Sequence, residues 1–496
     1  MCQMAIATWA MATGGITTVW LACVNSQRPS LSASTVTRRL TGICLVHIAI
    51  AASTVSAGSN AATAADISPT AAMTAVALTT TWVVTSTTRR AVSVPEYWVL
   101  CQLAAVLMAT MATAPDMIVG YLSIEGIALM TYISVGLLQL SEYSTEAALK
   151  YYVLSCVASL AFIAAICLVF TTMGTTLLSD LQLLTNTNGW WDGHGSDLLL
   201  IAVSCTWAAI AFKLALAPWH LWSPDVLEGS PAVVLAFVAF IPKTALLSLL
   251  IKLNCLFQPV LLLGWVAVTV GYVSLFVGGL GAVAQYSWRR MLAFGGTAQL
   301  GFAVFAFALA TASAVSSAMI HFIAYAVGSF ALFTCIGAVG HGRFGVRGIR
   351  YLWYLSGSWA ISPMLALLVA GCALSLFGMP PSWGFAAKAN VIFALVVGGL
   401  GHQYALWAML TKTLSSVYCL RLALCMYTAR GFAFASFVLS NVGKASAAFA
   451  AALPVALWEG YLIRSIARLR WLKRWAVGDA CNYAMRKRYQ WNSLNH

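Results

Sequence analysis

The stretch KLALAPWHLWSPDVLEGSPAVVLAFVAFIPK, residues 213–243, decides how the rest of the chain is interpreted. It begins at Lys213 and ends at Lys243, and both lysines are embedded in apolar sequence. Between them lie the helix-breaking and polar residues Pro218, His220, Pro224, Asp225, Glu228, Pro231 and Pro242. A charge at the centre of a bilayer costs about 2.5–3.5 kcal/mol on insertion scales, so it is rarely kept without a function. The stretch therefore indicates movement of an ion or a proton through a membrane.

The composition is that of a membrane protein. Hydrophobic residues make up 61% and charged residues 8% of the 496 residues, outside the range of soluble domains. Because a crossing helix needs about 20 apolar residues, we predict an all-α polytopic protein with about fourteen transmembrane helices. The predicted spans lie near residues 3–24, 40–57, 70–87, 96–114, 115–139, 147–173, 196–217, 230–252, 258–285, 291–311, 315–340, 353–379, 402–429 and 445–467, and 385–400 is the second half of an interrupted twelfth span.

The net charge of +14 follows the loops between these spans and does not indicate nucleic-acid binding. Alternate loops, which face one side, carry Arg38, Arg39, Arg89, Arg90, Arg289, Arg290, Arg343, Arg347, Arg350 and Arg430. This is the positive-inside pattern of polytopic proteins. A basic tail that begins near Arg464 would lie on the opposite side. Either the number of spans is off by one, or the tail binds a partner or an anionic lipid such as cardiolipin.

The thirteen cysteines do not form a metal or redox motif. The closest two, Cys419 and Cys425, are six residues apart, and the sequence contains no C-x-x-C. Iron–sulfur clusters and structural zinc sites need clustered thiolates. No glycine-rich nucleotide motif is present either. We therefore predict that this chain binds no metal and no cofactor of its own.

Two interrupted spans suggest an internal repeat. Lys213 ends the seventh span five residues before Pro218, and Lys388 follows Pro380 and Pro381 in the twelfth span. The two are five spans apart, an odd number, so the repeats are expected to be inverted, as in transporters with a site near the midplane. The alternative is that Lys213 simply extends from a helix end toward water. The predicted domains are N-terminal transmembrane helices (1–95), a first inverted five-helix repeat (96–254), a second (255–430), and a C-terminal helix with the basic tail (431–496).

A carboxylate is expected to balance the lysines. Glu125 lies in the middle of a predicted span, and Lys150 lies 25 residues later, near the start of the next one. Adjacent antiparallel helices would bring the two together as an ion pair. An opposite charge favours the ionised form of each group and desolvation opposes it, so such a pair can exchange protons. A purely structural pair is the alternative.

Four motifs surround these residues: FKLALAPWHLWSPDVLEGSP (212–231), RMLAFGG (290–296), GMPPSWGFAAK (378–388) and EAALKY (146–151). Over residues 115–430 the chain resembles subunit 2 of mitochondrial NADH:ubiquinone oxidoreductase (respiratory complex I), the counterpart of bacterial subunit N. The larger antiporter-like subunits and the Mrp-type antiporters usually have L-P-x-A-H-x-x-A-P where this chain has SPDVLEGSP. Subunit 4 has a glutamate where this chain has Lys388.

The resemblance implies a proton-translocating, antiporter-like subunit of a larger enzyme, driven by quinone reduction elsewhere in the complex. It implies Glu125 and Lys150 as the pair where protons enter, Lys213 as the carrier of the first repeat, Lys243 as connector and Lys388 as the carrier of the second. The implied partners are the other membrane-arm subunits. The implied location is the mitochondrial inner membrane, with a bacterial plasma membrane as the alternative.

The sequence departs from the family at the tenth span. Gln299 stands where the family commonly has a histidine, and Phe294-Gly295-Gly296 replaces Y-S-S. Because glutamine does not titrate, a relay through position 299 is in doubt. His321 either compensates for it or is a hydrogen-bonded core residue. Two further functions stay open: a free-standing or Mrp-type sodium/proton antiporter subunit, and a scaffold that conducts nothing.

Overall fold

The computed structural model describes residues 96–137, 141–187, 196–257, 261–307, 309, 312–344, 351–361, 363–380, 382–397 and 402–427. The expectations for 1–95 and 431–496, including the basic tail, lie outside these residues. The described helices are α4 (Glu96–Thr113), α5 (Met117–Val135), α6 (Glu142–Met173), α7 (Leu178–Thr187), α8 (Ser196–Lys213), α9 (Trp222–Gly229), α10 (Ala232–Phe257), α11 (Leu261–Ala284), α12 (Trp288–Phe307), α13 (Ala312–Phe344), the short η4 (Leu352–Leu355) and α14 (Ser358–Ile361), α15 (Pro363–Phe377), α16 (Trp383–Val397) and α17 (His402–Tyr427).

The described part is a helical membrane bundle. Five stretches of it are long and apolar enough to cross a membrane: Met117–Val135, Glu142–Met173, Val266–Ala284, Trp288–Phe307 and Ala314–Gly337. The interrupted spans divide into shorter apolar helices, α15 and α16 having 15 residues each. At 1.5 Å per residue each of these covers about 22 Å, less than the bilayer core of about 30 Å. The predicted total of about fourteen helices is not tested by the described residues.

Within these residues the predicted spans agree with the observed helices, including the interruption between α15 and α16. The predicted span 353–379 is divided into η4, α14 and α15, which was not expected. Two further short helices, α7 and α9, were not expected either. They have 10 and 8 residues and carry polar side chains, so neither stands out as an apolar run. The first lies between the end of α6 and the start of α8, and the second follows the break after Lys213.

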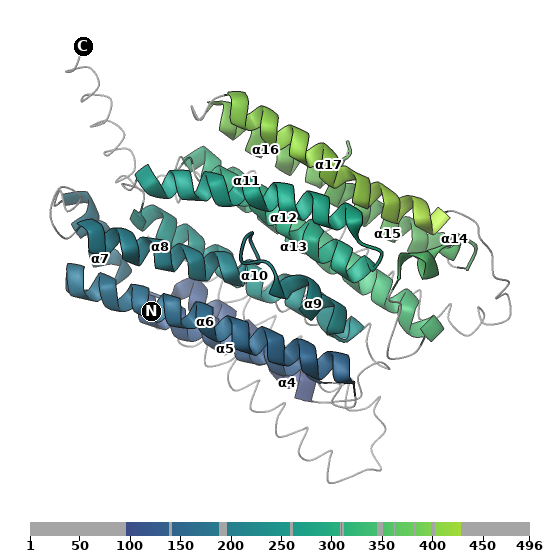
Figure 1. Cartoon of the computed structure of the whole chain (residues 1–496), viewed down its shortest axis with the longest axis horizontal. Helices are drawn as coiled ribbons and strands as arrows, with labels where there is room; N and C mark the ends of the chain where they lie inside the picture. Colours follow the sequence, from purple (N-terminus) through teal and green to yellow (C-terminus); the bar gives the residue numbers. More distant parts are fainter. Residues whose placement is uncertain are drawn as a thin grey trace, which may run out of the picture.

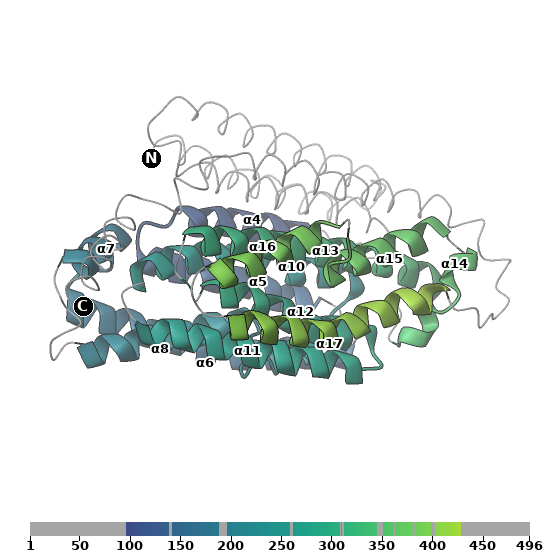
Figure 2. The ribbon, with the colours of Figure 1, turned by 90° about the horizontal axis from the view of Figure 1, so that it is seen from above.

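The chain crosses the bundle from one side to the other. Figure 1 shows α4, α5 and α6 on one side, α10 to α13 in the middle, and α15, α16 and α17 on the far side. Seen from above, α6, α8, α11 and α17 lie along one face (Figure 2). Packing of α10 on α13 and of α9 on α12 joins the first part of the chain (α4–α10) to the second part (α11–α17). Residues of α10 and α13 are therefore central to any path between the two parts.

Both parts have the same helix order. Three continuous helices (α4–α6 and α11–α13) precede an interrupted helix (α8/α9 and α15/α16), and one more helix follows. The same backbone cross-link also occurs twice. Asp116, before α5, forms an isolated bridge with Leu177 after α6, and Ser287, before α12, forms one with Tyr351 after α13. The second and third helices of each part are thus tied at the same end.

The contact between α11 and α12 depends on glycine. A Cβ atom on Gly301 would lie 2.6 Å from Ser274 Cβ, and one on Gly278 would lie 2.6 Å from the backbone nitrogen of Ala298. Small residues let helix backbones approach closely in membranes, where packing replaces the hydrophobic effect as the cause of association.

We predict that Gly301→Ala destabilises the protein by about 1–3 kcal/mol, because the added methyl group overpacks the α11–α12 contact. The matched control is Gly371→Ala in α15, where a Cβ meets nothing within 4 Å. The measurement is the thermal unfolding midpoint of the detergent-solubilised protein. Equal midpoints for the two variants would contradict the packing argument.

Candidate functional site

The helix that carries Lys213 ends in a specific backbone motif. Lys213 is the last helical residue of α8, and Ala215 has a left-handed conformation with φ of 58°. The Leu216 amide donates to the carbonyl of Ala211 (2.8 Å), and the Ala215 amide donates to that of Phe212 (2.9 Å). This is the Schellman ending, in which glycine is the usual left-handed residue. Alanine there costs about 1–2 kcal/mol, so the break beside Lys213 is strained.

Side chains from other helices hold this break. The Trp222 indole at the start of α9 donates to the Phe212 carbonyl at 2.9 Å, and its ring stacks on Tyr151 with centroids 4.4 Å apart. The amide of Ala217 donates to Ser274 Oγ at 2.9 Å. Backbone groups freed by the break are thereby satisfied inside the protein, as they must be within a membrane.

Lys213 is buried and forms an ion pair with Glu125. Its Nζ lies 2.9 Å from Glu125 Oε1 and donates to Ser155 Oγ at 2.8 Å. Ser159 donates to the same carboxylate oxygen at 2.6 Å. The Lys213 side chain is 7% exposed and that of Glu125 is 24% exposed, so the carboxylate is the more accessible partner. Helices α5, α6 and α8 each contribute to this cluster, which we call the Glu125–Lys213 pair with its two serines.

The expected ion pair between Glu125 and Lys150 is wrong. Lys150 Nζ lies 2.7 Å from Glu146 Oε1 and 3.6 Å from Asp225 Oδ2, and its side chain is 47% exposed. The reason is its position along α6. Ser159, which does contact Glu125, lies nine residues farther on, or about 13 Å along the helix axis. Lys150 is thus near the end of the bundle, and Lys213 takes its place.

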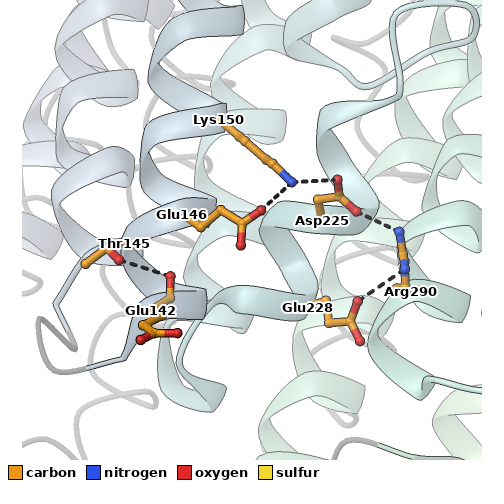
Figure 3. A network of polar contacts seen from close by, with 7 residues as sticks. All are labelled: Glu142, Thr145, Glu146, Lys150, Asp225, Glu228 and Arg290. Atoms are coloured by element: carbon orange, nitrogen blue, oxygen red, sulfur yellow. Dashed lines mark hydrogen bonds and ion pairs between the residues drawn. The ribbon is translucent and has the colours of Figure 1, made fainter.

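Lys150 belongs instead to a polar network around α9 (Figure 3). Arg290 of α12 donates to Asp225 Oδ1 at 2.6 Å and lies 3.4 Å from Glu228 Oε2. The neighbouring Arg289 donates to the carbonyls of Glu228 (3.0 Å) and Ser230 (2.8 Å), which are at the C-terminal end of α9. Cations near a helix C-terminus are favourable. The network ties α9 to both α6 and α12.

Lys243 lies buried in α10, next to the helix proline Pro242. Its Nζ donates to Tyr325 Oη of α13 at 3.0 Å and lies 5.3 Å from the centre of the Tyr325 ring. A cavity of about 10 Å³ lies between Lys213 and Pro242, with Tyr151 and otherwise apolar side chains around it. This is close to the smallest volume that holds one water molecule.

Lys388 occupies the second helix break. The α15 helix ends in a Schellman motif like that of α8, here with Gly378 (φ 87°) in the left-handed position. The Lys388 ammonium donates to the carbonyls of Leu376 and, at 2.5 Å, Phe377. These are carbonyls that the end of α15 leaves without an intrahelical partner. A Cβ on Gly378 would lie 2.9 Å from Lys388 Nζ, so glycine is needed for both the backbone conformation and the lysine.

Gln299 and His321 lie next to this break. Gln299 Nε2 donates to the Leu376 carbonyl at 2.9 Å, the same oxygen that accepts from Lys388. His321 Nε2 lies 3.2 Å from the backbone oxygen of Gln299. His321 is thus a buried residue within hydrogen-bond distance of the α12 backbone, and a role of His321 in proton transfer stays a prediction.

The sequence reasoning missed Ser155, Ser159, Tyr325 and Lys252. The two serines are four residues apart and so share one face of α6, a spacing that could have indicated a polar face. No local sequence pattern indicated that Tyr325 belongs to the site. Lys252 in α10 donates to the Ala114 carbonyl at 2.8 Å, beyond the end of α4, and so stabilises a helix terminus.

Comparison with known proteins gives the family and the fold of this chain. Residues 114–417 match the family model "NADH:quinone oxidoreductase/Mrp antiporter, TM". NADH-quinone oxidoreductase subunit N 2 of Rhizobium meliloti is 30% identical over 374 residues, 74% of this chain and 76% of the relative. Subunit N 1 of Acidiphilium cryptum is 33% identical over 341 residues, 67% of this chain and 68% of the relative.

Solved structures share the fold. A chain of respiratory complex I from Thermus thermophilus matches with a TM-score of 0.72 at 22% identity and covers 91% of this chain and 96% of its own length. A chain of the Mrp complex from a Dietzia species matches with a TM-score of 0.79 at 18% identity, over 96% and 97%. With a family match over more than half its length, this chain belongs to the transmembrane NADH:quinone oxidoreductase/Mrp antiporter family.

Proposed function

We propose that this chain is the subunit N-type, proton-translocating member of a respiratory NADH:quinone oxidoreductase. The observation that carries the proposal is the buried Glu125–Lys213 ion pair at a helix break, where titratable groups and freed backbone meet. The named relatives, all NADH-quinone oxidoreductase subunits N, support the assignment to this enzyme. The chain would then contribute proton pumping, and the redox chemistry would take place elsewhere in the complex.

The Glu125–Lys213 pair is the proposed switch. At an effective dielectric constant of about 20, a charge roughly 6 Å away changes the energy of an ammonium by about 3 kcal/mol. Moving the Glu125 carboxylate away from Lys213 therefore weakens the hold of the lysine on its proton. Ser155 and Ser159 keep hydrogen bonds to the two groups while the proton moves.

From Lys213 the proposed path continues through Lys243 to Lys388. The small cavity lined by Lys213, Tyr151 and Pro242 supports the first step, since it lies beside both the lysine at the break in α8 and the neighbour of Lys243. Lys388 is the proposed carrier of the second part, held by the carbonyls at the end of α15.

We propose that residues 96–254 and 255–430 form inverted repeats. The shared helix order supports this, as do the repeated bridges of Asp116 with Leu177 and of Ser287 with Tyr351. Two interrupted helices that end in the same backbone motif are the third argument. Interrupted helices in inverted repeats bind ions near the membrane centre in transporters.

Lys150 keeps a proposed role in this path, as a residue that positions α9. Its contacts with Glu146 and Asp225 connect α6 to the helix that follows the Lys213 break. Because Arg290 of α12 shares the Asp225 carboxylate, a shift of charge in this network would be felt in both parts of the chain.

The proposed partners are the other membrane-arm subunits of the complex, and anionic lipid at the basic loops. The relatives are bacterial, which favours the bacterial plasma membrane, the alternative location. Subunit 2 of a mitochondrial enzyme stays a prediction. An Mrp-type sodium/proton antiporter subunit is the second candidate function, supported by the shared fold alone.

We predict that Lys213→Met lowers proton pumping by at least about tenfold in membrane vesicles that contain the assembled complex, because no group remains to exchange a proton with Glu125. The measurement is the rate of NADH-driven acidification, with assembly checked on a native gel. The matched control is Lys252→Met, which removes a half-buried lysine that donates to the Ala114 carbonyl after α4 and has no place in the proposed path. Pumping at the wild-type rate by assembled Lys213→Met would disprove the proposal, and activity without partner subunits would favour the antiporter.

A second prediction concerns Lys388. Gly378→Ala should lower pumping several-fold, because the new methyl group displaces the ammonium from the end of α15. Gly174→Ala is the matched control: Gly174 ends α6 with φ of 75°, and a Cβ there meets nothing within 4 Å. Both variants carry the strain of a left-handed alanine, about 1–2 kcal/mol. If both lowered pumping equally, strain and not Lys388 would be the cause.

A further inference from the structure

The second part of the chain lacks carboxylates. The sequence contains no Asp or Glu between Glu228 and Glu459, so neither Lys243 nor Lys388 has an acid partner within this region. Both lysines are nevertheless buried, with 6% and 7% exposure. Buried ammonium groups need hydrogen-bond acceptors in place of water. The described acceptors nearby are backbone carbonyls and tyrosine hydroxyls.

Tyr325 fills a space that Gly296 leaves open. A Cβ on Gly296 would lie 2.5 Å from Tyr325 Oη and 3.6 Å from Lys243 Nζ. The hydroxyl can therefore reach the ammonium, at 3.0 Å, only because residue 296 has no side chain. Tyr325 itself is buried in α13.

Tyr418 fills the neighbouring space in the same way. A Cβ on Gly295 would lie 2.7 Å from Tyr418 Oη, which reaches this point from α17. Gln299 Nε2, one helical turn along α12, lies 3.5 Å from that hydroxyl and donates to the Leu376 carbonyl. The same carbonyl accepts from Lys388. Two tyrosine hydroxyls from two helices thus lie against consecutive glycines, between the contacts of Lys243 and those of Lys388.

We propose that Tyr325 and Tyr418 carry the proton between Lys243 and Lys388, in place of the carboxylate that serves Lys213. This inference rests on the proposed proton-pumping function and extends it to residues on α13 and α17. Gln299 is a positioning residue: its amide holds the Tyr418 hydroxyl and the Leu376 carbonyl in place.

The chemistry of a hydroxyl suits this task, since it accepts and donates a hydrogen bond at once. The N–H bond of the Lys243 ammonium breaks as a new O–H bond forms on Tyr325, and the original O–H proton of Tyr325 passes to a water molecule or to Tyr418 Oη. Tyr418 in turn gives up its own O–H proton, through water, to the neutral amine of Lys388, where a new N–H bond forms. Both tyrosines end neutral, Lys243 ends as an amine and Lys388 as an ammonium. Phenylalanine keeps the ring and removes this function.

The two glycines allow a reciprocal test in the assembled complex. Tyr325→Phe removes the hydroxyl beside Lys243, and the added substitution Gly296→Ser returns one to the same space. A double variant of Tyr325→Phe with Gly296→Ala has the same backbone and nearly the same volume without the hydroxyl. Tyr97→Phe, a fully buried tyrosine of α4 in contact with Phe237, is the control for loss of a buried phenol.

We expect Tyr325→Phe to lower NADH-driven acidification on the order of tenfold, the loss that corresponds to one hydrogen bond to a charged group. The serine double variant should recover most of the rate, the alanine double variant should not, and Tyr97→Phe should pump normally. Tyr418→Phe should also pump slowly. Assembly on a native gel should be equal for the two double variants, because their shapes match.

Two results would overturn the inference: wild-type pumping by assembled Tyr325→Phe, or equal rates for the serine and alanine double variants. Wild-type pumping by Tyr418→Phe would remove that residue from the path. Lys213→Met, measured in parallel, separates the two levels of the argument. If Lys213→Met pumps normally, the proposed function fails. If it does not pump while Tyr325→Phe does, only the tyrosine path fails.

Discussion

A lysine ammonium that leaves water must find hydrogen-bond acceptors, and in a membrane helix the backbone offers none because its carbonyls are already bonded. Breaking the helix solves this problem for Lys388, whereas Lys213, at the break that ends α8, is met by Glu125 and Ser155. Lys213 is the last residue of α8, and Lys388 reaches the last carbonyls of α15. The breaks in turn require the Schellman endings and the side chains that hold them, so much of the architecture between α8 and α16 follows from two buried charges.

The two parts of the chain satisfy their lysines differently. Lys213 pairs with the Glu125 carboxylate and donates to Ser155, whereas Lys388 donates to backbone carbonyls. An ion pair changes strongly when one partner moves, because the interaction is between full charges. The interaction energy of an ammonium with carbonyl dipoles changes less when one of these groups moves, because a carbonyl oxygen carries only a partial charge. On the proposed function, the first part is therefore where a change in the rest of the complex acts most directly, and the second part receives the proton.

The polar network around α9 connects the Lys213 break to the second part of the chain. Asp225 forms ion pairs with Lys150 and Arg290, and Arg289 donates to the carbonyls at the end of α9. The short helix that follows the Lys213 break is therefore fixed to α12, the helix that also carries Gln299 and the two glycines of the tyrosine site. Gain or loss of charge at one of these positions alters the field at the others, since several charged groups lie within a few ångströms.

The sequence by itself determined the long helices among the described residues, the positions of both breaks and the presence of lysines at them, because hydropathy, proline and glycine act within a few residues. Only the tertiary structure decided that Glu125 pairs with Lys213 and not with Lys150, and that Tyr325 reaches Lys243 over a glycine. Those contacts join residues 88 and 82 positions apart. They depend on how far each helix is shifted along its neighbours, and this shift is set by the packing of whole helix faces and by no local pattern.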